Sequence, residues 1–499
     1  MSTINPNSVF RYVVPFYFGD TKTDSSESDY DRFCRSLDDS DLWVADPISP
    51  KQHDIFDYIC NSVMQSAQGA GIGRGWNYLF GSKKLMFRYA ADPEKEKYLY
   101  WQIAAAGIYI FRTNIGFIWY EIEPSKKQTH PISLIDFKVF QSRFKELARR
   151  DTYFERFVPK TSCDSIDTYT TFRPVDWICE LLSHLYDNYH FMNAVGSKLE
   201  RPDTALIFNY AVFDGEAEEE LPRTACILAN GYTDRYRLHP SSFSDTITPF
   251  ENTCWYASKS GCGYFAANAS PNSFFANGLS MRIRIDYFFM YILSLYQSYS
   301  LLNYLRRMST EHSADPEKYV RVSEEGSNLD HFVAELNTFL MKGMYSSVSN
   351  IQHQNEFFEY LQKRLNVKDD IESIGLGIDA LVNLQRLQKD KDDATRKENE
   401  SERSAAREKR VNSALAIISL LSVFSAVNDL GDFISNCMEL LGSGTDIFKL
   451  ATWANVGQIF VAGLPWTAFQ LLVNIVITAM VVVCLAILIR NCFDRPKKK

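Results

Sequence analysis

Four alternating glycines near the N-terminus are the first residues whose spacing suggests a chemical task. Gly69, Gly71, Gly73 and Gly75 lie on either side of Arg74 in the stretch QGAGIGRGW. Backbone N–H groups that no side chain covers, with a guanidinium beside them, can cradle a phosphate group. The stretch lacks the Lys-Ser/Thr ending of a P-loop, and its spacing fits no dinucleotide fingerprint. A phosphate-binding loop and a plain flexible turn therefore both fit this pattern.

A second pattern lies near the C-terminus, where polar residues recur on one side of a predicted helix. The stretch from Val411 to Val427 has no charged residue, but asparagine and serine interrupt it. At 100° per residue, Asn412, Ser419, Ser422, Ala426 and Asp429 fall within an arc of about 100°. Hydroxyl and amide groups suit a helix that faces water in a pore, and tight helix packing is the alternative use of serine. The predicted pore-lining residues are Asn412, Ser419, Ser422 and Ala426.

Acidic residues follow these predicted pore-lining residues and indicate which ions would pass such a pore. Asp429 comes where a ring of carboxylates, one from each copy of the chain, would favour cations. The connection from Asn428 to Leu464 holds four acidic residues and one basic residue, a net charge of −3. An acidic outer loop would attract cations toward the opening.

The most apolar stretch of the chain is Trp466 to Ile489, which has 24 residues and no charge. At 1.5 Å per residue it makes about 36 Å of helix, enough to cross a bilayer, although a buried core helix is the alternative. Basic residues precede Val411 and follow Ile489, which places both outer flanks in the cytoplasm. The sequence therefore predicts a multi-pass protein of the bacterial inner membrane, with the lipid bilayer as a partner and both termini cytoplasmic.

The composition of the 499 residues limits the remaining possibilities. A net charge of −8 argues against duplex nucleic acid as a partner. A mean hydropathy of −0.22 is too low for a transporter with many spans. The ten cysteines show neither CxxC spacing nor paired histidines, so no zinc site or disulfide framework is indicated. The N-terminus has no signal peptide, and we find no catalytic constellation, so we expect a protein that is not an enzyme.

Residues 1–280 have the mixed pattern of an α/β domain. Val9 to Phe18 predicts a strand that Pro15 would push to a sheet edge, and Ile108 to Ile122 predicts a hairpin around Thr113 and Asn114. Further strands are expected at Ala205–Val212 and Ala225–Leu228, and helices at Phe137–Phe157 and Val175–Phe191.

The second half of the chain reads as helical. Ile285 to Leu305 is nearly uncharged, but its tyrosines and amides favour a buried helix over a membrane span. From Asn350 an apolar repeat predicts a stalk helix, in which Gly375 and Gly377 mark either a kink or a close helix contact. Gln388 to Arg410 is a helix or a solvated linker. The predicted organisation is a sensor domain at 1–280, a connector at 281–349, a stalk at 350–410, spans at 411–428 and 465–490 around an outer loop at 429–464, and a basic tail at 491–499.

This layout resembles the CorA family of divalent-cation channels. The matching stretches are SALAIISLLSVFSAV at Ser413–Val427, LPW at Leu464–Trp466 and the PKKK ending at Pro496–Lys499. The resemblance implies a homopentamer with a mixed α/β (α+β) cytoplasmic domain, a long stalk helix and two C-terminal transmembrane helices, of which the first lines the pore. It also implies Mg2+ as the transported ion and possible ligand.

The match is incomplete at the outer end of the first span. Where the family has Gly-Met-Asn, this chain reads Ala426 to Gly431, so that only Asn428 matches, and Asp429 beside it supplies a charge. Asn428 and Asp429 are the predicted selectivity residues. By the same resemblance Asp369, Asp370 and Glu372 could hold a metal ion between subunits, and a solvated helix face is the alternative.

Three functions are consistent with this sequence. The first is a CorA-like cation channel gated by its cytoplasmic domain. The second is suggested by a resemblance to the CorA-like membrane effectors of type III CRISPR systems, an antiviral defence opened by a nucleotide second messenger. The third is a membrane-tethered scaffold that conducts nothing.

Overall fold

The computed structural model forms two compact units, Met1–Gln388 and Lys389–Lys499. Each unit is described here by itself. The structure describes residues 2–19, 28–46, 54–64, 71–81, 84–92, 97–149, 154–158, 168–216, 218–269, 273–313 and 328–442, together with the four single positions 476, 479, 483 and 486.

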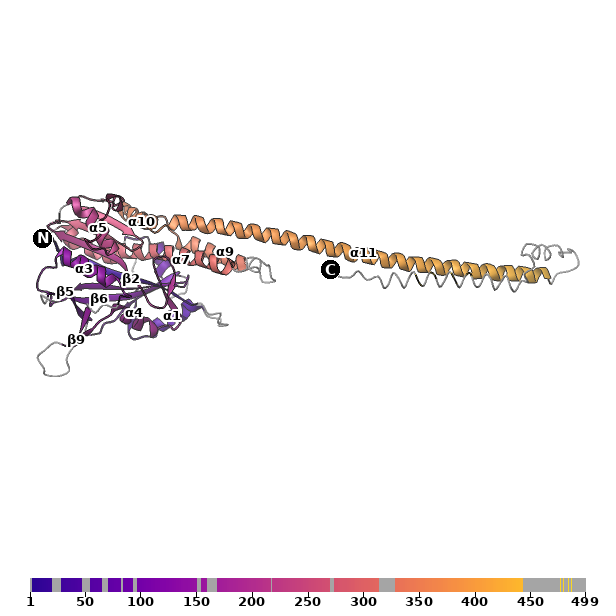
Figure 1. The fold of residues 1–499 in the computed structure, drawn as a ribbon, viewed down its shortest axis with the longest axis horizontal. Helices are drawn as coiled ribbons and strands as arrows, with labels where there is room; N and C mark the ends of the chain where they lie inside the picture. The colour runs from indigo at the N-terminus through magenta and orange to yellow at the C-terminus, as the bar shows by residue number, and fades with distance from the viewer. Residues whose placement is uncertain are drawn as a thin grey trace. The chain divides into compact units, whose positions relative to one another are not determined.

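The first unit is built on one mixed sheet (Figure 1), in which 14 strands are described. Its main path runs β13-β14-β12-β2-β7-β6-β5-β8-β9, with the shorter strands β1, β3, β4, β10 and β11 attached beside it. β12 and β14 pair in parallel, and the other described pairs are antiparallel. The strands are β1 (Thr3–Ile4), β2 (Val9–Phe18), β3 (Trp43–Ala45), β4 (Gly73–Tyr78), β5 (Met86–Asp92), β6 (Lys97–Phe111), β7 (Ile115–Pro124), β8 (Phe154–Val158), β9 (Thr168–Thr171), β10 (Tyr189–Met192), β11 (Lys198–Leu199), β12 (Leu206–Asp214), β13 (Thr253–Ser258) and β14 (Gly261–Ala267).

The predicted hairpin is confirmed as β6 and β7. Asn114 turns the chain with φ 61°, a left-handed conformation that asparagine tolerates. β2 is also confirmed, but the expectation that Pro15 places it at an edge is wrong, because β2 lies between β12 and β7. Pro15 lies where one neighbour of β2 changes from β12 to β10, a place at which a strand tolerates a residue without an N–H.

Helices cover both faces of the sheet, because side chains of each strand alternate between two apolar cores. One core is formed with α2, α7, α9, α10 and the start of α11. The other is formed with α1, α3, α4 and α5. The helices are α1 (Asp29–Asp38), α2 (Asp57–Met64), α3 (Leu134–Lys145), α4 (Pro174–Ser183), α5 (Leu221–Asn230), α6 (Leu279–Arg282), α7 (Phe288–Ser313), α9 (Asn328–Gly343), α10 (Gln352–Arg364) and α11 (Val367–Gly442), with short 3-10 turns η3 (Glu218–Glu220) and η4 (Pro240–Ser242) and π-helical turns η5 (Phe274–Gly278) and η6 (Ile283–Tyr287).

Some predicted elements have the wrong type or length. Ala225–Leu228 lies inside α5, which starts with a proline in its first turn and ends at the left-handed Gly231, the usual helix start and stop signals. The helix predicted at Phe137–Phe157 ends at Lys145, and part of its remainder is β8. The helix predicted at Val175–Phe191 ends at Ser183 and is followed by β10. Ala205–Val212 is confirmed as β12 apart from its first residue.

The prediction that Ile285–Leu305 is a buried helix is confirmed by η6 and α7. Two of its buried polar side chains have backbone partners: Ser294 donates to the carbonyl of Met290 at 2.8 Å, and Gln297 to that of Gly343 at 3.0 Å. Each buried amide or hydroxyl needs such a partner, since leaving it without one would cost about 1–3 kcal/mol.

The predicted stalk differs from the structure at both ends. The chain breaks between α10 and α11, where Asn366 adopts φ 59°, and α11 then continues unbroken to Gly442. The first 14 residues of the predicted outer loop, 429–442, are therefore helical. The charged stretch is helical and has an i to i+4 ion pair, between Arg396 and Glu400 at 3.3 Å.

The predicted membrane part of the fold is wrong. Within the described residues, no helix has both the length and the apolar character needed to cross a bilayer. The uncharged run at 411–428 makes about 27 Å of helix, short of a hydrocarbon core of roughly 30 Å, and the same helix continues into acidic residues. The second predicted span, 465–490, lies almost entirely outside the described residues. The fold with two transmembrane helices in a CorA-like pentamer, and the multi-pass inner-membrane localisation, are therefore withdrawn in favour of a mixed α/β unit with a long C-terminal helix.

Candidate functional site at the start of helix α11

The junction between α10 and α11 lies in the core of the first unit. Leu365 follows the last residue of α10 and Val367 begins α11, and both side chains are buried. Between them, the carbonyl of Asn366 accepts from the N–H of Asp370 at 3.0 Å, which starts the hydrogen-bond ladder of α11. The long helix is therefore anchored by burial where it begins.

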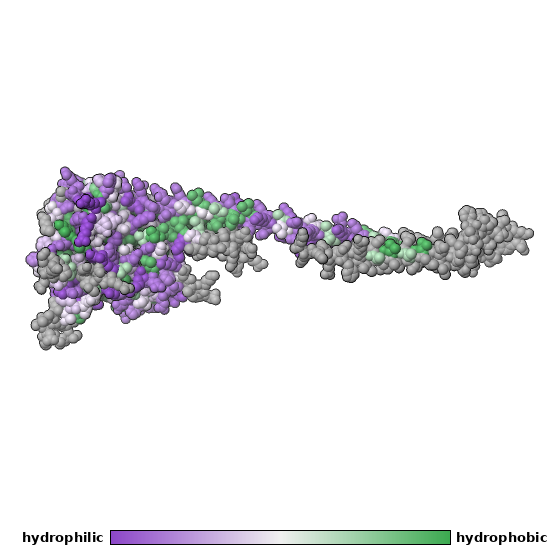
Figure 2. All heavy atoms as spheres, in the orientation of Figure 1, coloured by the Kyte–Doolittle hydropathy of each residue, from purple (hydrophilic) through white to green (hydrophobic). Residues whose placement is uncertain are grey.

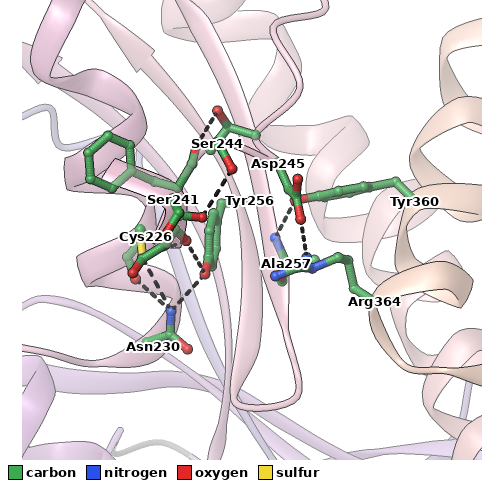
Figure 3. Close-up of polar contacts among 12 residues, drawn as sticks. Cys226, Asn230, Ser241, Ser244, Asp245, Tyr256, Ala257, Tyr360 and Arg364 are labelled. Atoms are coloured by element: carbon green, nitrogen blue, oxygen red, sulfur yellow. Dashed lines mark hydrogen bonds and ion pairs between the residues drawn. The ribbon is translucent and has the colours of Figure 1, made fainter. Parts of the chain in front are cut away.

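Side chains of α10 hold this junction against strand β13 (Figure 3). Arg364 donates through Nε to the carbonyl of Ala257 at 2.8 Å, and the N–H of Ala257 donates to the hydroxyl of Tyr360 at 3.2 Å. β13 ends the main path of the sheet, and a bridge between Trp255 and Ile247 pairs part of its outer edge. One turn of α10 thus satisfies both backbone groups of Ala257, which would otherwise form an open sheet edge.

An ion pair connects the same arginine to the loop before β13. Arg364 Nη1 lies 2.9 Å from a carboxylate oxygen of Asp245, whose side chain is 68% exposed. An ion pair so exposed contributes about 0–1 kcal/mol, because water screens it. We call Tyr360, Arg364, Asp245 and Ala257 the α10 clamp. Its backbone contacts hold the junction, while its ion pair is weak enough to open.

A second polar group lies beside the clamp, between α5 and β13 (Figure 3). Asn230 donates through Nδ2 to the carbonyl of Cys226 at 2.9 Å and to the hydroxyl of Tyr256 at 3.3 Å. That hydroxyl donates to the carbonyl of Ser242 at 3.2 Å. Burial raises the pKa of the Cys226 thiol, and it raises the pKa of Tyr256 to about 12. Both groups are therefore protonated at neutral pH, which suits hydrogen bonding and not nucleophilic attack.

Past the junction, α11 packs against α7 through a glycine. A Cβ at Gly377 would meet the thioether of Met308, which would have to shift to admit it, so the two helices lie close together here. Ile374 is buried in the same core. Gly375 faces open space. Of the two alternatives left open for these glycines, Gly377 is a close helix contact, and neither glycine interrupts α11.

In the second unit, α11 carries apolar residues that the described chain does not cover. Val411, Leu415, Ile418 and Leu421 are each more than half exposed, at 57, 55, 59 and 62%. Their steps of four, three and three residues place them on one face of the helix. We call these four residues the α11 row. Figure 2 shows hydrophobic residues interrupting the hydrophilic surface along this helix.

The glycines predicted to cradle phosphate lie mostly on a strand. Gly73, Arg74 and Gly75 belong to β4, Gly71 precedes it, and Gly69 lies outside the described residues. A Cβ at Gly73 would collide with the ring of Phe111 across the strand pair, so the packing of β4 against β6 explains the glycine at this position. Arg74 pairs with both carboxylate oxygens of Asp38, at 2.8 and 3.0 Å. Phosphate binding here stays a prediction.

The predicted pore and metal residues all lie on α11. Asn412, Ser419 and Ser422 are exposed, whereas the side chains of Ala426, Asn428 and Asp429 lie outside the described residues. Asp369, Asp370 and Glu372 lie in its first two turns, where burial raises the pKa of Asp370 and Lys259 opposes that shift. In the part of the chain that the structure describes, no three acidic, histidine or cysteine side chains gather as a metal site. The roles assigned to these residues stay predictions.

Sequence reasoning missed the α10 clamp and the α11 row. The clamp joins residues 119 positions apart, Asp245 and Arg364, and no local pattern marks such a pair. The row did have a signal, since its residues are four of the large apolar residues in the stretch assigned to the first span. Comparison with protein-family models, with curated proteins and with solved structures found no match to this chain.

Proposed function

We propose that this chain is a self-associating regulatory protein, whose copies meet along the α11 row and whose folded unit anchors the start of that helix. The observation that carries the proposal is the row itself, four large apolar side chains more than half exposed on one helix face. Contiguous apolar surface of this kind marks an interaction site. The channel, effector and scaffold functions all required membrane spans. Only self-association and control by the folded unit are retained from them.

A second copy of the same helix is the partner that fits this row best. The steps of four and three residues from Val411 to Ile418 are those of a coiled-coil seam with Leu421 beside it, and two copies present identical rows to each other. The preceding stretch, Gln388–Arg410, has eight basic and seven acidic residues, so its net charge of +1 offers little repulsion between copies. Because Gln388–Arg410 has no apolar seam of its own, the contact between the two copies is confined to the α11 row and the part of α11 after it.

The folded unit can influence this association because α11 is one continuous helix from Val367 to Gly442. Its first turns are fixed by the buried Val367 and Ile374, and the α10 clamp holds the turn before it. A change in the packing of this anchor is thus passed to the helix itself.

The test is the mass of the full chain in solution, measured by light scattering behind a sizing column. The proposal predicts a mass that is a multiple of 57.4 kDa. The triple variant Leu415→Ser, Ile418→Ser, Leu421→Ser should shift toward the monomer by at least tenfold in dissociation constant. Leu376→Ser is the matched control, since Leu376 is an exposed leucine of α11 outside the row, and it should leave the mass unchanged. A monomeric wild-type chain at tens of micromolar, or an unchanged triple variant, would refute the proposal.

A further inference from the structure

The segment Asp245–Thr248, which we call the edge segment, pairs with the outer edge of β13 at one residue. Ile247 and Trp255 exchange both backbone hydrogen bonds, with N···O distances of 3.2 and 2.7 Å. An antiparallel ladder repeats this kind of hydrogen-bonded pair at every second residue. The next such pair toward the start of the edge segment would therefore join Asp245 to Ala257, whose backbone groups lie on the same edge of β13 as those of Trp255.

In the structure, α10 binds the backbone groups of Ala257 instead (Figure 3). The N–H of Ala257 donates to the hydroxyl of Tyr360 at 3.2 Å, and its carbonyl accepts from Nε of Arg364 at 2.8 Å. Asp245 is an exposed residue whose backbone N–H and carbonyl make no hydrogen bond with any described residue. The ladder therefore stops at Ile247, because the α10 clamp occupies the two groups of β13 that it would use next.

The sequence of the edge segment suits a strand. Its last three residues are two threonines and an isoleucine, which are all β-branched and favour extended backbone. In the other direction the ladder cannot grow, because the next pair would need an N–H from Pro249. Only the pair of Asp245 with Ala257 is open to extension.

From these two sets of partners we infer that Ala257 is the contact point of a two-position switch. In the clamped position, which the structure shows, Ala257 is bound by α10. In the paired position, its N–H donates to the carbonyl of Asp245 and its carbonyl accepts from the N–H of Asp245, so that the edge segment becomes a further strand of the sheet. Both positions satisfy the backbone groups of Ala257, which is buried and needs a partner for each of them.

The clamped position is the more stable one in the wild-type chain, because it also satisfies the hydroxyl of Tyr360 and adds the ion pair of Arg364 with Asp245. Water screens that ion pair, since the carboxylate is 68% exposed. In the paired position the last turn of α10 loses its two hydrogen bonds to β13, which loosens the anchor of α11. The switch does not depend on self-association, and only its effect on the α11 row rests on the proposed function.

The test removes the side-chain groups that compete for Ala257 and follows hydrogen–deuterium exchange of the full chain by mass spectrometry. In the double variant Tyr360→Phe, Arg364→Met, the amide of Asp245 should exchange at least tenfold more slowly than in the wild type, because it then donates to Ala257. The amide of Ala257 should change by less than threefold, because one partner replaces another. The amides of the α10–α11 junction should exchange faster.

Further variants separate a switch from simple loss of the clamp. Adding Asp245→Pro to the double variant removes the N–H that pairing needs, so the amide of Ala257 should exchange at least tenfold faster than in the double variant. Lys363→Met is the matched control, because Lys363 is the exposed neighbour of Arg364 on α10, and it should exchange as the wild type does. Circular dichroism checks the fold, and Arg364→Met alone gives the same comparison if the double variant does not fold. An amide of Asp245 that does not slow, or an amide of Ala257 that exchanges tenfold faster without the proline, would overturn the inference.

Discussion

Replacing Glu121 by alanine should strongly destabilise the first unit, because this carboxylate holds two arginines at the interface of the sheet with α7. Arg11 Nε lies 2.8 Å from one oxygen of Glu121, and Arg284 Nε lies 2.8 Å from the other. The guanidinium of Arg11 is enclosed by the rings of Trp119 and Phe288, with centroids 4.6 and 4.3 Å away. The Arg11 and Glu121 side chains are only 7 and 5% exposed, so water cannot replace the missing partner.

The size of the effect follows from this burial. Removing one member of a buried ion pair leaves the other charge without compensation, at a cost of about 3–5 kcal/mol. Burial already lowers the pKa of Arg11, and Glu121 opposes that shift. Arg284 is 35% exposed and can turn to water, so its loss adds little. We therefore expect the free energy of unfolding to fall by about 3–5 kcal/mol, nearly all of it from Arg11.

The assay is urea unfolding of the full chain followed by tryptophan fluorescence. Glu155→Ala is the control, because Glu155 pairs with Arg88 at 2.6 Å but is 39% exposed, and its removal should cost about 0–1 kcal/mol. The double variant Arg11→Met, Glu121→Leu should recover much of the lost stability, since no buried charge is left without a partner. Equal losses of less than about 1 kcal/mol in Glu121→Ala and the control would refute this reasoning, because losses of that size are expected only for exposed pairs.

Three further predictions test the packing, the clamp and the titration of the first unit. Gly375→Ala should raise the free energy of unfolding by about 0.5–1 kcal/mol, because this helical glycine faces open space. Gly116→Ala should lower it by about 1–3 kcal/mol, because the added Cβ would collide with the ring of Phe16. Urea unfolding measures both changes. Asp245→Asn should speed amide hydrogen exchange at the α10–α11 junction with little change in global stability, and high salt should reproduce this in the wild type. Burial raises the pKa of Tyr256 to about 12 in the folded chain. The contribution of this tyrosine to stability is therefore complete below pH 10, the ordinary pKa of tyrosine, and is lost as the pH rises toward 12. Tyr256→Phe should lose less stability than the wild type between about pH 9.5 and 11.

The elements that can be predicted correctly from the sequence are those whose pattern is local. The β6–β7 hairpin shows two aromatic, β-branched runs around Asn114, and the turn uses that residue's tolerance of positive φ. The buried helix at Ile285–Leu305 is recognisable from its amides and hydroxyls, of which Ser294 and Gln297 have backbone partners. In both cases the residues that decide the structure lie within one element.

The errors arise where a segment is considered apart from the residues beside it, or where distant residues decide the structure. Ala225–Leu228 has strand-like composition, but the helix signals on either side of it prevail. The uncharged run of α11 resembles a membrane span only when it is considered apart from the helix that contains it. The α10 clamp depends on which strand forms the edge of the sheet, and that depends on the pairing of every strand before it. Such information is not present in any short window of sequence.

Continuity of α11 is what relates its two ends physically. Each residue of the helix is held by a hydrogen bond to the residue four before it, so the ladder of α11 runs without interruption from the buried Ile374 to Gly442. Gly377 lies where this helix contacts Met308 of α7, and a larger side chain there would have to displace the thioether. Gly377→Leu should therefore lower the free energy of unfolding of the first unit by about 1–3 kcal/mol, measured by urea unfolding.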